Sequence, residues 1–254
     1  MKNIIQATLI IGFLSACGEK TEIENQPSEQ EKVSNTTVEG MAKRHIESTL
    51  GIPATEKYTY KIYKEHLDSD NKIDAIIVVN RKQFALQKAN GSNKTAKEAS
   101  TGFTGRYNYI FYYDGGLNKI SPEIVVPSSA LVELKVAFEN ITSDAYKDII
   151  IDYRIKGGSF YDFLTVNNHS PERIFQWKHF GNLGSADTYE AFHFEYAEGT
   201  LNPRKDILVK KALLQKPTSE IDIYTFVPTI VPTDELLYRF FYLPEQGKYV
   251  TQMN

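Results

Sequence analysis

Cysteine is almost absent from this sequence, since Cys17 is the only one. The rest of the chain therefore has neither a disulfide nor a free thiol. A strong charge of either sign is also missing, because 29 Lys and Arg are balanced by 32 Asp and Glu, for a net charge of -3. The basic residues are dispersed rather than clustered, and this argues against a nucleic-acid partner.

Motifs of the common enzyme classes are missing as well. The sequence has no G-x-S-x-G elbow, no H-E-x-x-H helix, no Walker loop and no G-x-G-x-x-G opening a helix. The five histidines are not spaced like metal ligands, although two could still meet in the folded chain; they stand at positions 45, 66, 169, 179 and 193. Glu195 and Glu198 with Asp206 are a candidate acid pair, but acids on β-turns are usually solvated. The sequence therefore favours a protein without enzymatic activity.

The N-terminus has the order of a secretion signal. Lys2 provides a basic start, residues 4–13 are mostly apolar, and small residues lead to Cys17. The stretch is too short for a stable membrane-spanning helix. The tetrapeptide LSAC at residues 14–17 resembles the bacterial lipobox, and this resemblance implies cleavage before Cys17 and lipid attachment to its thiol. The sequence thus predicts a signal peptide over residues 1–16 and a lipid-anchored mature protein.

A polar segment over residues 17–38 begins with the lipid attachment site. It is rich in Glu, Gln, Ser, Asn and Lys and contains no aromatic residue, so we expect a flexible tether. Gly18 stands where some Gram-negative lipoproteins have an Asp that retains them in the inner membrane. The resemblance therefore favours the outer membrane over the inner one. Whether the domain faces the periplasm or the exterior stays open.

Residues 39–254 form the folded domain, for which the pattern predicts mainly β structure. One short helix is expected near its start, over about residues 41–50, with Gly51 as a stop signal. Beyond it, apolar and polar residues alternate as in β-strands, for example in residues 58–63, 107–113 and 133–138. The polar stretch 88–105 is expected to be a mobile loop between strands.

Three segments share one plan, a polar turn that ends in Asp and leads into an apolar strand. The Asp residues are Asp74, Asp148 and Asp206. This recurrence predicts three antiparallel sheet units, over about residues 52–127, 128–183 and 184–254. The apolar runs after Asp74 and Asp148 are continuous, which predicts central strands buried on both faces, whereas the alternating strands should lie at sheet edges.

The segment LDSDNKIDAIIV at residues 67–78 resembles the loop and strand of FG-GAP and VCBS-type repeats, whose usual form is D-[LV]-[ND]-G-D-G-x-x-D-[LIV]. Such repeats form blades of β-propellers, and many of their loops hold calcium. His66 replaces the first Asp of the motif, and Ser69 and Asn71 replace its glycines. Because three units are fewer than a closed ring normally has, the resemblance implies a partial or degenerate β-propeller.

The same resemblance makes Asp68, Asp70 and Asp74 candidate calcium ligands. Asp at every second position of a tight turn can direct several carboxylates to one point, which suits this hard cation. The same side chains can instead accept hydrogen bonds from backbone N–H groups and hold the turn. We expect turn stabilisation, with calcium as the alternative, and no other cofactor.

Together these observations favour a lipid-anchored cell-envelope protein that acts as a non-catalytic binding or assembly module. Its partners would be the membrane, through the lipid on Cys17, and an envelope protein or glycan. The alternative is a hydrolase of envelope polymers whose carboxylates are brought together by the fold. A deep pocket with convergent polar groups would favour the hydrolase, and a shallow exposed aromatic surface would favour the binding module.

Replacing Cys17 with serine should abolish lipidation, because no other thiol in the chain can accept the diacylglyceryl group. Metabolic labelling with an alkyne analogue of palmitate measures the outcome. The parent protein should carry the label, and the Cys17→Ser protein should be unlabelled and of precursor size. Label that persists on the variant would contradict the lipobox assignment.

Overall fold

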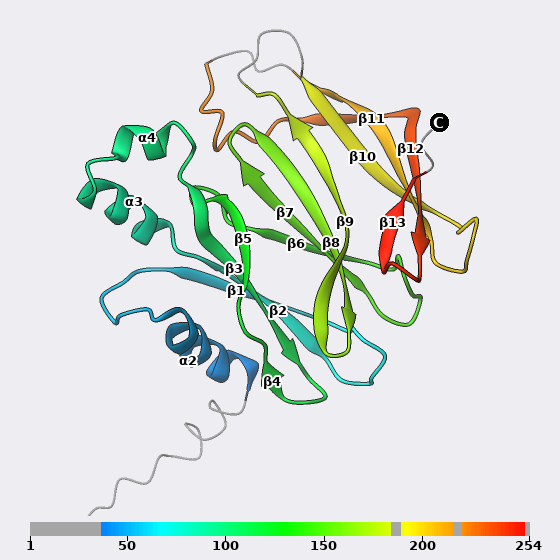
Figure 1. Ribbon diagram of the computed structural model, residues 1–254, viewed down its shortest axis with the longest axis horizontal. Helices are drawn as coiled ribbons and strands as arrows, with labels where there is room; N and C mark the ends of the chain where they lie inside the picture. The colour runs from blue at the N-terminus through cyan, green and yellow to red at the C-terminus, as the bar shows by residue number, and fades with distance from the viewer. Residues whose placement is uncertain (1–36, 184–188, 216–219, 252–254) are drawn as a thin grey trace, which may run out of the picture.

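The computed structural model describes residues 37–183, 189–215 and 220–251. In these residues the chain forms three helices, α2 to α4, and 13 strands (Figure 1). The expected signal peptide and nearly all of the expected tether, including Cys17, lie outside the described residues. Within the described part, none of the helices has the length and apolar character needed to cross a membrane.

The first half of the domain forms a five-stranded antiparallel sheet, sheet A. Its strands are β1 (Thr59–Glu65), β2 (Asp74–Asn80), β3 (Thr104–Asp114), β4 (Lys119–Ile120) and β5 (Ile124–Ser129). The order is β1, β2, β3, and both β4 and β5 pair with the remaining edge of β3. Sheet A spans residues 59–129, and the first unit expected from the sequence is about residues 52–127.

The second half forms one eight-stranded antiparallel sheet, sheet B, in which the strands follow chain order. They are β6 (Lys135–Glu139), β7 (Asp148–Ile155), β8 (Gly158–Asn167), β9 (Ser170–Gly181), β10 (Glu190–Ala197), β11 (Asp206–Leu214), β12 (Ile230–Leu243) and β13 (Lys248–Val250). Two sheets are therefore present where three were expected. The reason is that β9 and β10 pair through Phe180 with Ala191 and Gly181 with Glu190, which joins the second and third units edge to edge.

Strand β2 lies at the centre of the fold and is buried along its whole length. Ile76 and Val78 pack toward sheet B, where Ile149 and Ile151 of β7 meet them. The alternate residues of β2, such as Ile77, pack on the opposite face of sheet A beneath α2. This two-sided burial is what the continuous apolar run predicts. The alternating strands β1 and β6 are edge strands as expected, but the alternating residues 107–113 belong to β3, which lies between β2 and β5, so the expectation is wrong for that strand.

Sheet B curls around a second, aromatic core. Phe163, Phe175, Phe240 and Tyr249 come from β8, β9, β12 and β13 and are all at least nine-tenths buried. Because the sheet curls, its last strand, β13, comes close to β9 near the middle of the sheet, as Figure 1 shows. The rings of Phe175 on β9 and Tyr249 on β13 have centroids 6.1 Å apart. The ends of the sheet do not pair with each other, and the curl stays open.

Helix α2 (Val38–Leu50) covers sheet A with Ala42 and Ile46, which are fully buried. Thr37 caps its first turn, since its hydroxyl oxygen accepts a hydrogen bond from the N–H of Gly40 at 3.2 Å. Gly51 ends the helix in the left-handed conformation, with a φ of 58°. The single helix expected from the sequence is therefore present, and it begins three residues earlier than expected.

Two further helices, α3 (Lys82–Gly91) and α4 (Thr95–Ala99), were not expected from the sequence. They occupy much of the stretch 88–105, so the expectation of a loop there is wrong. Ala85 and Ala89, one helical turn apart, pack against Phe103, which is only 8% exposed. Because alanine carries little hydrophobic signal, the apolar stripe of α3 is inconspicuous in the sequence.

Replacing Ile77 with alanine should lower the free energy of unfolding by about 2 to 5 kcal/mol, because it leaves a cavity between sheet A and α2. Urea unfolding of the parent and the variant measures the difference. Ile73→Ala is the matched control, since Ile73 is 47% exposed and should cost little. Equal losses in the two variants would contradict the two-sided burial of β2.

Candidate functional site at the junction of the two sheets

Three hairpins have the same closing geometry. The loops β1–β2, β6–β7 and β10–β11 are of equal length, and each is closed by a residue pair that ends in Asp. The pairs are Glu65 with Asp74, Glu139 with Asp148 and Ala197 with Asp206. Each Asp is the first residue of its strand and is at most 1% exposed.

The buried carboxylates hold the loops from inside. Those of Asp74 and Asp148 accept a backbone N–H hydrogen bond from Leu67 at 3.0 Å and Ile141 at 3.1 Å. Asp206 accepts one from the N–H of Thr200 at 3.2 Å. Burial raises the pKa of Asp74 and Asp148, and the backbone hydrogen bonds partly oppose this rise by favouring the charged form. The three Asp residues thus occupy equivalent places.

The β1–β2 loop differs from the other two at one position. Thr142 and Thr200 each donate a hydroxyl hydrogen bond to the buried Asp of their own loop, at 2.8 and 2.9 Å. Asp68 stands at the corresponding position of the first loop, and there it accepts the N–H of Asp70 at 2.8 Å. The first loop therefore places a carboxylate at the surface where the others have a hydroxyl turned inward.

All three residues singled out as calcium ligands accept backbone hydrogen bonds. Asp70 accepts the N–H of Lys72 at 2.6 Å, and Asp74 uses its second oxygen for the N–H of Gly115 at 2.9 Å. Asp74 therefore ties the β1–β2 loop to the β3–β4 turn with both of its oxygens. These are the turn hydrogen bonds that the favoured interpretation of the sequence requires.

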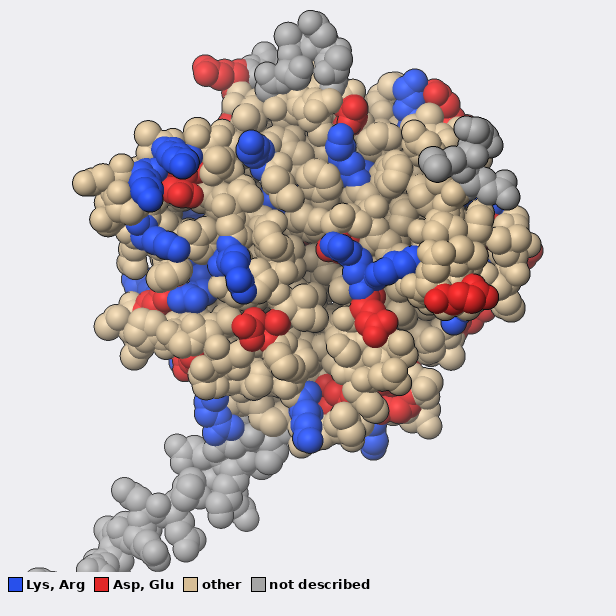
Figure 2. Space-filling model, in the orientation of Figure 1, with Lys and Arg blue, Asp and Glu red and all other residues tan. Residues whose placement is uncertain are grey.

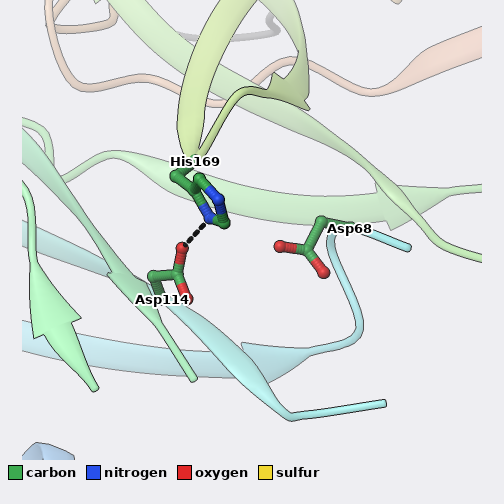
Figure 3. Close-up of side chains that lie close together, drawn as sticks. All are labelled: Asp68, Asp114 and His169. Carbon is green, nitrogen blue, oxygen red and sulfur yellow. Dashed lines mark hydrogen bonds and ion pairs between the residues drawn. The ribbon is translucent and has the colours of Figure 1, made fainter. Parts of the chain in front are cut away.

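A different set of ligand-type side chains meets at this end of the molecule. Ligand atoms of Asp68, Asp114 and His169 all lie within 4.8 Å of one another, and this is the one such group among the described residues (Figure 3). His169 Nδ1 is 2.7 Å from Asp114 Oδ2, so the β8–β9 turn of sheet B is bonded to the end of β3 in sheet A. Asp70 and Asp74 are outside this group.

Local backbone geometry positions His169 and Asp70. Asn168 and His169 both have positive φ, 48° and 62°, as in the two-residue turns that suit the twist of a hairpin. A Cβ on Gly116 would lie 2.1 Å from Asp70 Oδ2 and 3.3 Å from Asp114 Oδ1, so only glycine lets these two carboxylates approach the β3–β4 turn so closely.

The loops enclose an open groove of about 360 Å³, here named the junction groove. Its lining residues are Asp68, Ser69, Asp70, Tyr146, Val166, Asn167, Asn168 and His169. Both sheets contribute, since the first three residues belong to the β1–β2 loop and the others to sheet B and its loops. The groove is rich in carboxylate, amide and hydroxyl groups, which can bind a polar ligand through several hydrogen bonds.

The sequence alone did not single out Asp114 or His169. Asp114 begins an Asp-Gly-Gly segment, which is typical of a hairpin turn, and His169 has no neighbouring ligand in the chain. The dipeptide Asn168-His169 between two aromatic strands is the available signal, because both residue types tolerate positive φ. Nothing in the sequence shows that the turn reaches the other sheet.

The acids considered for catalysis have different partners. Glu195 accepts a hydrogen bond from Lys210 at 2.7 Å and lies 3.3 Å from His193. Asp206 is buried and bonded to Arg239 at 2.8 Å, and the same guanidinium donates to the backbone carbonyl of Glu198. The carboxylate of Glu195 is therefore paired with Lys210, and that of Asp206 is paired with Arg239.

Comparison with known proteins yields no relative for this chain: no family model matches it, and neither does any curated protein or solved structure.

Replacing Asp74 with alanine should lower the free energy of unfolding by about 1 to 3 kcal/mol, because the backbone N–H groups of Leu67 and Gly115 lose their acceptor. Thermal melts of the parent and the variant, each with and without about 1 mM calcium, test the cause. The difference in melting temperature between the parent and the variant should be the same with and without calcium. A calcium-dependent melting temperature in the parent that is lost in the variant would show that a cation, not the turn, requires Asp74.

Proposed function

We propose that this chain is a lipid-anchored cell-envelope protein whose β domain is a non-catalytic binding module. The observation that carries the proposal is the junction groove, a polar recess of about 360 Å³ to which both sheets contribute. Sites built by loops at the end of rigid sheets are a common way to bind ligands, because the sheets preorganise the loops. Here the buried Asp residues hold the loops in place.

The groove chemistry indicates the kind of partner. Asp68 and Asp70 supply carboxylates, and Asn167 and Asn168 supply amides that both donate and accept hydrogen bonds. A donor-rich partner fits this lining, such as the basic side chains of an envelope protein or the hydroxyl groups of a glycan. Calcium is the alternative occupant, held by Asp68 and Asp114 beside His169.

Anchoring belongs to the same proposal. Lipid on Cys17 would keep the domain at the envelope, in the outer rather than the inner membrane, and two or more acyl chains make such attachment stable.

The three hairpins with equivalent Asp residues support a degenerate propeller-like repeat as the origin of the domain. The hydrolase alternative lacks comparable support, because Glu195 and Asp206 are engaged by separate cations.

A capture experiment with groove variants tests the proposal. The mature chain without its lipid is immobilised and exposed to envelope extract from the same cells, and bound protein and glycan are quantified. The double variant Asp68→Asn, His169→Gln should lose most of the captured partner, because the groove then loses a charge and its link between the sheets. Asp144→Asn is the matched control, since Asp144 lies in the equivalent β6–β7 loop and its side chain is 94% exposed.

Three outcomes decide between the alternatives. Capture lost in the double variant and kept in the control supports the junction groove. Capture that is equal in all proteins shows that the partner binds elsewhere and contradicts the proposal. Capture that requires added calcium assigns the ion as a component of the site. Melting temperatures of the variants, measured alongside, establish that each is folded.

A further inference from the structure

A second and larger groove lies at the other end of the β1–β2 hairpin. It has a volume of about 450 Å³ and is here named the basic groove. Its lining residues are Lys57, Tyr58, Thr59, Asn80, Lys82, Gln83, Leu131 and Glu133. A groove of this volume is within the range of small-molecule sites. The junction groove shares none of these residues.

A buried ion pair brings the two lysines of this groove together. Glu56 accepts two hydrogen bonds from Arg81, both at 2.6 Å, and the two side chains are only 4% and 9% exposed. Arg81 also lies over the ring of Phe84 at 4.3 Å. Lys57 and Lys82 directly follow Glu56 and Arg81 in the chain, so the pair holds the backbone of both lysines beside the groove that they line. Bidentate pairs of this kind are rigid.

The lining holds two lysines and one acid, Glu133, whose pKa is lowered chiefly by Lys61 and in part by the charge of Lys82. Neither Lys57 nor Lys82 has an ion-pair partner within 4.0 Å among the described residues. Glu133, the one acid of the lining, is engaged by Lys61 and Thr59, both at 2.7 Å. The hydrogen bond from Lys61, followed by that from Thr59, lowers the pKa of Glu133 and keeps it ionised. Lysines outnumber acids in the lining, and this balance favours the binding of an anion.

The floor of the groove is preorganised by buried amides. The side-chain amide of Asn80 donates to Asn108 at 2.8 Å and to the carbonyl of Ala130 at 3.0 Å. Asn108 in turn donates to Ser128 and to the carbonyl of Ser129 on β5. The oxygen of Asn80 accepts the N–H of Lys82 at 3.0 Å. A fully bonded network of this kind rigidifies the backbone that carries Lys82.

The surface around the basic groove is also positively charged. Lys and Arg side chains gather over the α3 and α4 side of the molecule in Figure 2, where few acidic side chains accompany them. Lys88 and Lys97 of these helices are exposed. Such a field raises the local concentration of anions near the groove. Tyr58 contributes to the lining of the groove, and its ring is stacked on that of Tyr60 with centroids 6.1 Å apart.

We propose that the basic groove binds an anionic sugar, with its carboxylate or phosphate between Lys57 and Lys82 and its ring against Tyr58. The groove would be a second ligand site of the domain, independent of the junction groove. A carboxylate and a phosphate share the chemistry that the lysines recognise, and direct binding measurements distinguish the two.

Isothermal titration calorimetry with three probes tests this assignment. Tri-galacturonate represents carboxylated sugars, glucose 6-phosphate represents phosphorylated ones, and maltotriose is the neutral reference. At least one anionic probe should bind and the neutral one should not. Lys57→Gln and Lys82→Gln should each weaken binding by about tenfold or more, which corresponds to the loss of one charge-assisted hydrogen bond. Raising the salt from about 20 to 200 mM should weaken it as well.

Matched variants separate the groove from the general basic surface. Lys88→Gln and Lys97→Gln remove the same charge nearby and should leave the affinity within about twofold, because exposed charges beyond the contact are screened by salt. Equal weakening in all four variants would overturn the proposal, as would equal binding of maltotriose or no binding of either anion. The double variant Asp68→Asn, His169→Gln should bind the anionic probe normally, so failure of the two grooves can be told apart.

Discussion

A buried carboxylate at the start of a central strand is the interaction on which this structure depends. Burying a charge is costly, and the cost is offset only when hydrogen-bond donors surround it. In all three hairpins the loop backbone supplies such a donor, and this hydrogen bond favours the observed conformation of the loop. Each Asp therefore fixes the register of the hairpin and the direction in which the loop leaves the sheet.

The β1–β2 hairpin illustrates how this constraint produces surface chemistry. At one end, Asp74 holds the loop so that Asp68 faces the β8–β9 turn of the other sheet. At the other end, the Glu56–Arg81 pair fixes the segments that enter β1 and leave β2, and it brings two lysines together. One hairpin thus supplies an acidic and a basic recess, separated by the length of a strand whose interior is fully buried.

Local patterns predicted the interior of the fold more reliably than its assembly. The continuous apolar runs identified β2 and β7 as central strands, since burial on both faces leaves no room for polar residues. The helix α3 was missed because Ala85 and Ala89 are too small to mark an apolar face. The fusion of the second and third units into sheet B depends on edge pairing between β9 and β10, and two short backbone pairings leave no mark on side-chain pattern.

The sequence by itself determined the features that act between near neighbours in the chain. These are the lipobox resemblance around Cys17, the β-rich character, and the Asp that closes each hairpin, because one of its backbone donors lies within the same loop. Only the tertiary structure decided which loops meet. Asp114 and His169 are far apart in the chain, as are Lys57 and Lys82, and each pair is joined by packing of the sheets or by a buried ion pair. Contacts of this kind depend on the relative placement of whole elements, and no local spacing of residue types encodes that placement.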